Sequence, residues 1–133
     1  SIYTTHNYIS VTEEHTMLRK GAIDASEGRK VCIPFNMRDG IAICIGKGNE
    51  QWLGSAPHGA GRKMTRNQAK KLITLSEYEA TMEGIFSTSV CTETLDESPQ
   101  AYKPSEEILS LITPTVDVIS FVKPKFNIKD TGK

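Results

Sequence analysis

The most constraining feature of this sequence is residues 55–71, which read SAPHGAGRKMTRNQAKK. His58 precedes two glycines that are one residue apart, and the start of a helix follows. Thr65 can cap this helix, and Gln68, three residues later, completes a capping box. The pattern predicts a glycine-rich loop that leads directly into a helix. The helical spacing predicts as its inward residues Ala69, Leu72 and Ile73.

The loop has the composition of an anion-binding site. Gly59 and Gly61 permit unusual backbone angles, so that successive amide N–H groups can converge on a phosphate. The helix N-terminus would add further donors, and Arg62 could bind phosphate oxygens in bidentate fashion. His58 carries an imidazole, which can act as a nucleophile, as a general acid or base, or as a metal ligand. An ordinary glycine turn with a polar loop histidine fits the same residues. Additional positive charge comes from Lys63, Arg66, Lys70 and Lys71.

Charge is unevenly distributed along the chain. The 133 residues have the length of a single domain and a formal net charge of zero. Residues 1–75 hold 11 Lys and Arg against 6 Asp and Glu, whereas residues 76–133 hold 5 against 10. The basic half contains His58 and fits a phosphate-bearing partner. The acidic half fits a solvated helical surface equally well.

The three cysteines indicate the compartment. Cys32, Cys44 and Cys91 have no metal-like spacing, and each lies in an apolar run. Buried free thiols are therefore expected, in a reducing, cytoplasmic setting. No apolar run approaches the length that spans a membrane, so no membrane partner is expected.

Residues 55–66, SAPHGAGRKMTR, closely resemble the signature of the RtcB family of RNA-splicing ligases. The resemblance implies that His58 attacks GTP and carries GMP as a phosphoramidate. It also implies that the nucleotide is contacted by the loop residues Gly59, Ala60, Gly61 and Arg62.

A second motif lies near the start of the chain, in a strand predicted over residues 2–11. His6 and Asn7 resemble a family pair in which the histidine binds manganese and the asparagine lies at the nucleotide. Judged from the residues alone, a His–Asn pair in a strand is more often a hydrogen-bonded polar spot. Residues 18–22, LRKGA, are similar to a family run and are predicted to form a short basic turn.

Residues 94–103, TLDESPQAYK, form the third motif. The resemblance implies that Tyr102 stacks near the guanine, although packing of a tyrosine ahead of a helix fits as well. Near the end of the chain, Lys129 matches a family lysine that meets the guanine. Lys125 and a loose, solvated tail over residues 123–133 are the alternatives.

One loop departs from the family pattern. Many relatives have Pro-Gly-Ser-Met at a loop that contacts GTP, where this chain has Pro34-Phe35-Asn36-Met37. A serine expected a few residues later falls on Ile41. Asn36 could still donate and accept hydrogen bonds with a nucleotide.

The expected fold is α+β, with mixed β-sheets and three short helices, the C-terminal part of an RtcB-like fold. Residues 1–133 are expected to form a single domain that is the C-terminal fragment of a longer chain. Further strands are predicted over 31–35, 40–46, 85–92 and 116–122, and further helices over 75–84 and after Pro104. The inward residues predicted for that last helix are Ile108, Leu109, Leu111 and Ile112.

The function implied is a GTP- and manganese-dependent RNA ligase that joins RNA 3′-phosphate or 2′,3′-cyclic phosphate ends to 5′-hydroxyl ends. Its partners would be such RNA ends, GTP and the N-terminal part of the same chain. The family's other metal ligands lie upstream of the His–Asn pair, so the fragment alone is expected to be inactive. Two alternatives remain, a nucleotide-binding or interaction module that has lost ligation, and a different phosphotransfer enzyme with a histidine intermediate. Competition between GTP and ATP would separate the last from a ligase.

Overall fold

The structure is a computed structural model that describes residues 6–11 and 16–128. It has the predicted α+β class, with both antiparallel and parallel strand pairs and three short helices. The strands are β1 (His6–Val11), β2 (Thr16–Asp24), β3 (Lys30–Pro34), β4 (Ile41–Gly46), β5 (Ser55–Pro57), β6 (Phe86–Ser87), β7 (Val116–Val122) and β8 (Phe126–Asn127). The helices are α1 (Arg66–Leu72), α2 (Leu75–Thr81) and α3 (Ser105–Ile112), and three 3-10 turns are η1 (Glu50–Trp52), η2 (Thr92–Glu97) and η3 (Pro99–Ala101).

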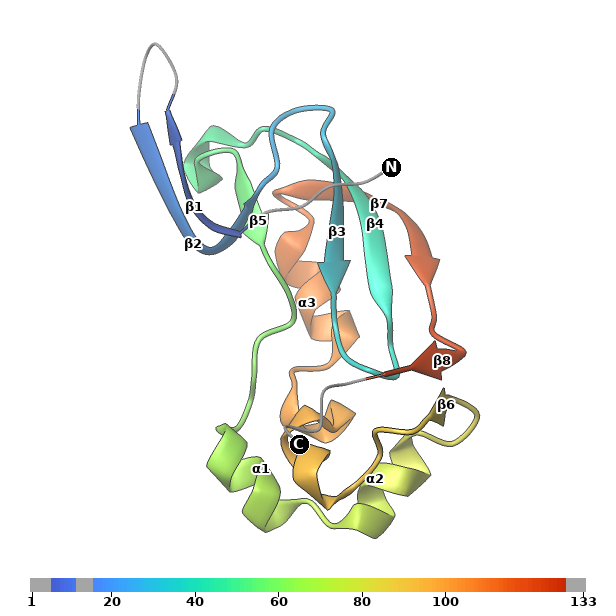
Figure 1. Cartoon of the computed structure of the whole chain (residues 1–133). Helices are drawn as coiled ribbons and strands as arrows, with labels where there is room; N and C mark the ends of the chain where they lie inside the picture. The colour runs from blue at the N-terminus through green and yellow to red at the C-terminus, as the bar shows by residue number, and fades with distance from the viewer. Residues whose placement is uncertain (1–5, 12–15, 129–133) are drawn as a thin grey trace.

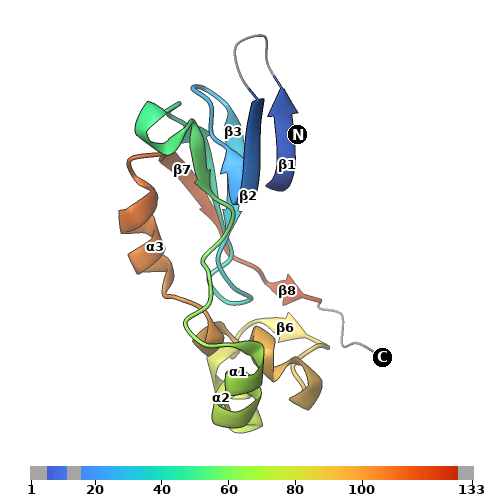
Figure 2. The ribbon, with the colours of Figure 1, turned by 90° about the vertical axis from the view of Figure 1, so that its left-hand side faces the viewer.

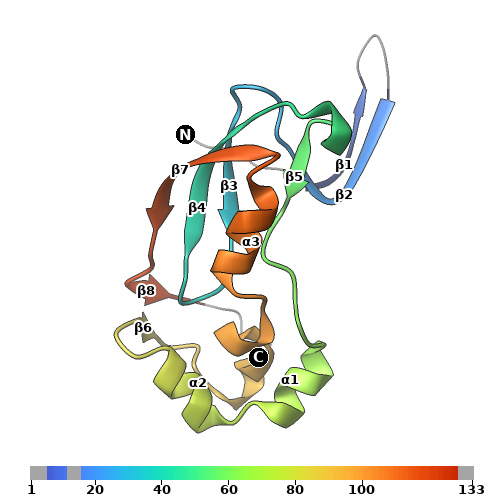
Figure 3. The ribbon, with the colours of Figure 1, turned by 180° about the vertical axis from the view of Figure 1, so that it is seen from behind.

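Two antiparallel sheets form one end of the molecule, with strand orders β1–β2–β5 and β3–β4–β7 (Figure 1). Helix α3 lies across one face of the β3–β4–β7 sheet (Figure 3). Apolar residues alternate along the strands and recur four apart on α3, so both elements turn an apolar face inward. The buried cluster between them includes Val31, Ile33, Ala42, Cys44, Ile108 and Ile112. The three cysteines form no disulfide within the described residues, and only Cys44 is buried as expected, since Cys32 and Cys91 are half-buried. Burial raises the pKa of the Cys44 thiol to about 11.

A separate helical layer lies at the other end, where α1, α2, η2 and η3 pack around a second cluster (Figure 2). Both α1 and α2 begin with a complete capping box, in which Thr65 pairs with Gln68 and Thr74 with Glu77. Tyr78, fully buried, donates a hydrogen bond to Met37 Sδ at 3.2 Å and so links this layer to the loop after β3. Tyr102 packs against both clusters and lies where the two layers meet.

Two of the secondary-structure predictions made from the sequence are wrong. Residues 18–22, predicted as a turn, lie inside β2, because β1 and β5 pair with its two edges. The strand predicted over 85–92 is reduced to β6, because local side-chain bonds replace strand pairing there. Ser89 N donates to Ser87 Oγ at 3.1 Å, and Thr94 Oγ1 donates to Ser89 O.

Two helix faces are narrower than their spacing predicts. Ala69 and Ile73 are buried as expected, but Leu72 is 68% exposed. On α3, Leu111 is 54% exposed although its neighbour Ile112 is fully buried. Each helix therefore buries only one narrow stripe. In the part of the chain that the structure describes, no helix has the length and apolar character needed to cross a membrane.

Candidate functional site

A cavity of about 770 Å³ lies where the two layers meet. It is lined by residues 34–37, 40, 41, 58–62, 97, 102, 122, 124 and 126–128. The cavity therefore brings together the His58 loop, the departing loop that contains Asn36, and Tyr102, which lie far apart in the sequence. It also takes residues from β8, which lies within the segment expected to be a loose tail.

His58 directly follows β5, whose backbone pairs with β2. Its N–H donates to Gly21 O at 3.4 Å, and its Nδ1 lies 2.7 Å from the same oxygen. A carbonyl oxygen only accepts, so Nδ1 carries a proton here, and in the neutral ring the lone pair is then on Nε2. Gly21 has a φ of +69°, in the left-handed region that favours glycine. The Arg-Lys-Gly-Ala run therefore has a structural use that the sequence did not reveal.

The glycines after His58 permit a close and sharply turned loop. A Cβ on Gly59 would lie 3.2 Å from Pro34 O, and Gly61 has a φ of +71°. The backbone N–H groups of residues 59–62 donate to no acceptor in the described part of the chain. Beyond them, Lys63 N donates to Ala101 O and Lys103 N to Gly61 O, which fixes the end of the loop. The loop is therefore held at both ends, and four successive amides in it have no acceptor in the part of the chain that the structure describes.

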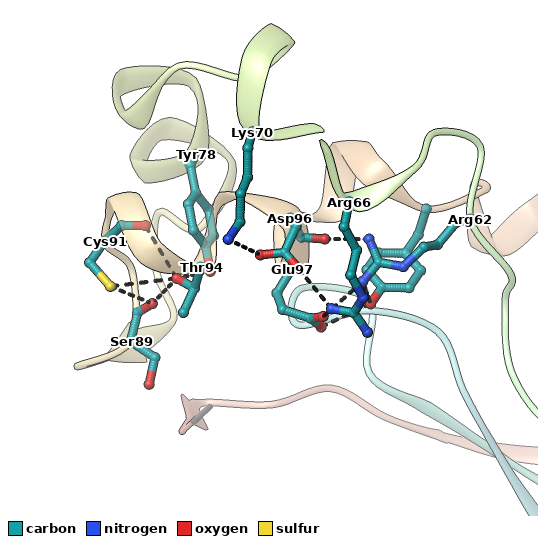
Figure 4. A network of polar contacts seen from close by, with 10 residues as sticks. Arg62, Arg66, Lys70, Tyr78, Ser89, Cys91, Thr94, Asp96 and Glu97 are labelled. Atoms are coloured by element: carbon teal, nitrogen blue, oxygen red, sulfur yellow. Dashed lines mark hydrogen bonds and ion pairs between the residues drawn. The ribbon is translucent and has the colours of Figure 1, made fainter. Parts of the chain in front are cut away.

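Arg62 is bound by acceptors of the protein itself (Figure 4). Its guanidinium donates to Asp96 O at 2.6 Å, to Glu97 Oε1 at 2.8 Å and to Tyr102 Oη at 3.0 Å. The guanidinium carbon also lies 4.7 Å from the centre of the Tyr102 ring. Burial, reinforced by Glu97, raises the pKa of Tyr102 to about 12, so its hydroxyl stays neutral and donates to Glu97 Oε2 at 2.8 Å.

Two further cations join the same cluster. Arg66 Nη1 lies 2.7 Å from Asp96 Oδ2 and 2.9 Å from Glu97 Oε1, and Lys70 Nζ lies 3.9 Å from Asp96 Oδ1. The hydrogen bonds that Arg66 donates to Asp96 and Glu97 raise the pKa of Arg66. Asp96 and Glu97 thus balance much of the positive charge predicted for the loop. Sequence reasoning did not name them as site residues, although they lie in the run that pointed to Tyr102. Helix α1 contributes no residue to the cavity lining.

Asn36 lines the cavity, but its side chain holds its own turn. Asn36 Oδ1 accepts from the N–H groups of Arg38 and Asp39, both at 2.9 Å, and Asn36 Nδ2 donates to Asp39 Oδ2 at 3.0 Å. The loop closes at Gly40, whose φ is +84°. A Cβ at Gly40 would lie 2.0 Å from Val122 O, so only glycine fits.

The remaining predicted residues lie at the edges of what the structure describes. His6 and Asn7 are in β1, where the backbone of His6 pairs with Ile23, and Ile23 in turn pairs with Ala56 in β5. Lys129 lies outside the described residues. Asn127, which the sequence did not single out, lines the cavity and donates to Met37 O at 3.4 Å. Among the described residues, no group of three or more His, Cys, Asp or Glu side chains could hold a metal ion.

Fold and site together define an α+β domain with a histidine beside a glycine loop of available amides. The family model for "tRNA-splicing ligase RtcB" matches residues 1–130. The RNA-splicing ligase RtcB of Escherichia coli strain K12 is 35% identical over 118 residues, which cover 86% of this chain and 29% of that relative. The tRNA-splicing ligase RtcB of Nanoarchaeum equitans is 31% identical over 135 residues, covering 81% of this chain and 28% of the relative. RNA-splicing ligase RtcB2 of Escherichia coli strain ATCC 25922 is 28% identical, covering 96% and 36%. This chain belongs to the RtcB family and spans about a third of the length of these relatives.

Proposed function

We propose that this chain supplies the histidine nucleophile and part of the nucleotide pocket of a GTP-dependent RNA ligase. The ligase would join RNA 3′-phosphate or 2′,3′-cyclic phosphate ends to 5′-hydroxyl ends through a GMP–His58 intermediate. It would act in the cytoplasm, which the free thiols support. Catalysis would require the N-terminal part of a family-length chain.

The observation that carries the proposal is that one cavity is lined by His58 and by residues 59–62, whose backbone N–H groups have no acceptor among the described residues. With its proton on Nδ1, His58 would attack the α-phosphorus of GTP through Nε2. The new Nε2–P bond would form as the bond to the bridging oxygen breaks, and pyrophosphate would leave with that electron pair. Amide N–H groups from residues 59–62 would stabilise the charge that develops on the phosphate oxygens.

Later steps would transfer GMP from His58 to an RNA 3′-phosphate, which restores the imidazole. Attack by a 5′-hydroxyl oxygen would then form the phosphodiester and release GMP. The apolar part of the cavity, which includes Phe35 and Met37, has room for a base, and the Tyr102 ring offers a stacking surface. Contacts with a nucleotide through Asn7 and Lys129 are part of the same proposal.

Manganese is expected only from the family resemblance, with His6 as the single ligand from this chain. The described residues do not form a manganese site, since they contain no cluster of three or more suitable side chains. We therefore derive no step through the metal, and its other ligands would come from the N-terminal part of the protein.

The test uses the longest natural chain that contains this sequence. Incubation with GTP labelled on the α-phosphate, with manganese present, should place GMP on the peptide that contains His58. His58→Ala should abolish the label, and His15→Ala should keep it and serve as a histidine-matched control. A folded, metal-loaded protein that takes up no label contradicts the ligase proposal.

A nucleotide-binding module without ligation is the second candidate. It is favoured by the Asn36 turn, whose side-chain polar groups bond to Arg38 and Asp39 within the loop. GTP binding without any adduct on His58 would select this candidate. Equal competition by ATP and GTP for adduct formation would select a phosphotransfer enzyme of relaxed base preference.

A further inference from the structure

We propose that Glu97 occupies the position of a ligand phosphate beside Arg62, so that a phosphate-bearing ligand must displace this carboxylate in order to bind Arg62. The inference rests on the phosphate-binding part of the proposed function and names a residue that controls affinity at that site. Glu97, Arg62 and Tyr102 all line the cavity.

The geometry around Glu97 is that of a bound anion (Figure 4). Its Oε1 accepts from Arg62 at 2.8 Å and from Arg66 at 2.9 Å, and its Oε2 accepts from Tyr102 Oη at 2.8 Å. A phosphate offers the same acceptor oxygens to a planar guanidinium. Protein and ligand therefore compete for the same donors.

Displacing Glu97 would leave both arginines in place. Arg66 would keep its 2.7 Å ion pair with Asp96, and Arg62 would keep its bond to the Asp96 carbonyl and its contact with the Tyr102 ring. The side chains of Glu97 and Arg62 are 17% and 22% exposed, so water and ligand can reach the pair. Only the carboxylate has to move.

The charges of the cluster predict whether phosphate binding becomes stronger or weaker when Glu97 is altered. The cluster holds three cations and two carboxylates, and Glu97 places negative charge beside any phosphate that reaches Arg62. Removing this charge should strengthen phosphate binding. A purely structural role predicts the opposite, because loss of the ion pair would release Arg62 and weaken binding.

The experiment measures binding of inorganic tripolyphosphate to this chain by titration calorimetry. Glu97→Gln keeps the size and the acceptor oxygen of the side chain and removes its charge. We expect it to bind about tenfold more tightly than the unaltered chain, and this gain to shrink at high salt. Glu83→Gln, the same change at an exposed site outside the cavity, should bind as the unaltered chain does. Equal or weaker binding by Glu97→Gln overturns the inference, as does the absence of tripolyphosphate binding in the unaltered chain.

A second measurement needs no variant and therefore does not depend on the folding of Glu97→Gln. Saturating tripolyphosphate should shift the ¹³C resonance of the Glu97 carboxylate in the unaltered chain, and an unmoved resonance contradicts displacement. The ligase proposal and the proposed role of Glu97 can each be contradicted without the other. Charge-dependent tripolyphosphate binding without a GMP adduct contradicts only the ligase, whereas an adduct with unchanged affinity in Glu97→Gln contradicts only the role of Glu97.

Discussion

The two sides of the cavity are held in place by different forces. On the sheet side, His58 is positioned by the Gly21 carbonyl, and the turn at Asn36 by uncharged Asn36 side-chain bonds to backbone N–H groups and by Gly40 in the left-handed region. On the helical side, Arg62 is positioned by its ion pair with Glu97 and its bond to the Asp96 carbonyl, and Tyr102 by its hydrogen bond to Glu97. The first kind of support depends on steric fit and is indifferent to salt, whereas the second is screened by it.

In the proposed function, the sheet side would hold the reacting histidine, and the helical side would control how tightly a phosphate binds. As the proposed nucleophile, His58 would gain from a fixed direction, and a backbone carbonyl that cannot titrate supplies one. As the proposed phosphate-binding residue, Arg62 would gain from a partner that can exchange, and the Glu97 carboxylate is such a partner. Substitutions on the two sides should therefore differ in their dependence on salt as well as in size.

The largest effect is expected at Gly40, on the sheet side. Gly40→Ala would place a Cβ 2.0 Å from Val122 O at a φ of +84°, and should cost about 3 kcal/mol or more in the free energy of unfolding. Gly28→Ala is the matched control, because Gly28 has a φ of +78° but nothing within 4 Å of its added Cβ. Gly28→Ala should lose only about 1 kcal/mol in the free energy of unfolding. Urea denaturation of both variants measures the difference, and equal losses would refute the steric account.

On the helical side, Asp96→Asn should have the next largest effect. Asp96 is 6% exposed and carries ion pairs to Arg66 and Lys70, and its loss should cost about 2 kcal/mol because Arg66 is itself largely exposed. The loss should shrink as salt is raised, which the loss at Gly40 should not do. Asp117→Asn, which removes an exposed carboxylate 3.5 Å from Lys47, is the control and should change little. If the loss of stability in Asp96→Asn does not depend on salt, the proposed difference in salt dependence between the two sides of the cavity is contradicted.

The sequence predicted those parts of the fold whose signals are local. The capping box at Thr65 and Gln68 located the start of α1, and the run of β-branched and aromatic residues over 116–122 matches the bounds of β7. It did not predict β2, because a basic stretch becomes a central strand only through partners distant in the sequence. Arg19 shows the reason, since its buried guanidinium donates to Ser55 Oγ, 36 residues further along the chain.

Within the candidate site, the sequence singled out residues of the cavity wall but not their partners. His58, Arg62 and Tyr102 came from motifs, and the structure places all three on one cavity. Their roles remain predictions. Gly21 and Glu97 were missed because their importance lies in which atoms they reach, and no spacing rule encodes a bond across the 37 residues between Gly21 O and His58.

A smaller effect is expected at Gly21. An alanine there must adopt a φ of +69°, which should cost about 1 kcal/mol. Its Cβ would lie 3.7 Å from His58 Cε1, an ordinary contact, so the ring need not be expelled. Relief of the strained φ would instead move the Gly21 carbonyl and loosen the Nδ1 bond. ¹⁵N NMR of the His58 ring should therefore show that the Nδ1–H tautomer dominates in the unaltered chain. In Gly21→Ala, the ratio of the Nδ1–H tautomer to the Nε2–H tautomer should be smaller. A dominant Nε2–H form in the unaltered chain would contradict the proposed nucleophile.

The smallest effect concerns acid stability on the sheet side, where charge also contributes. Burial alone would raise the pKa of Asp24, but hydrogen bonds from Ser26 and the charges of Arg19 and Arg29 outweigh it and hold the pKa below its usual 3.8. Because the folded carboxylate binds protons less readily than the unfolded one, its stabilisation is complete above pH 3.8 and is lost as the pH falls through the folded pKa. Asp24→Asn should therefore unfold with a shallower pH dependence below 3.8, measured by denaturant titration. Arg29→Gln, which removes the charge 3.1 Å away, should flatten the profile only in part. An acid profile in Asp24→Asn as steep as that of the unaltered chain would show that Asp24 adds nothing to the sheet side, which would then rest on steric fit alone.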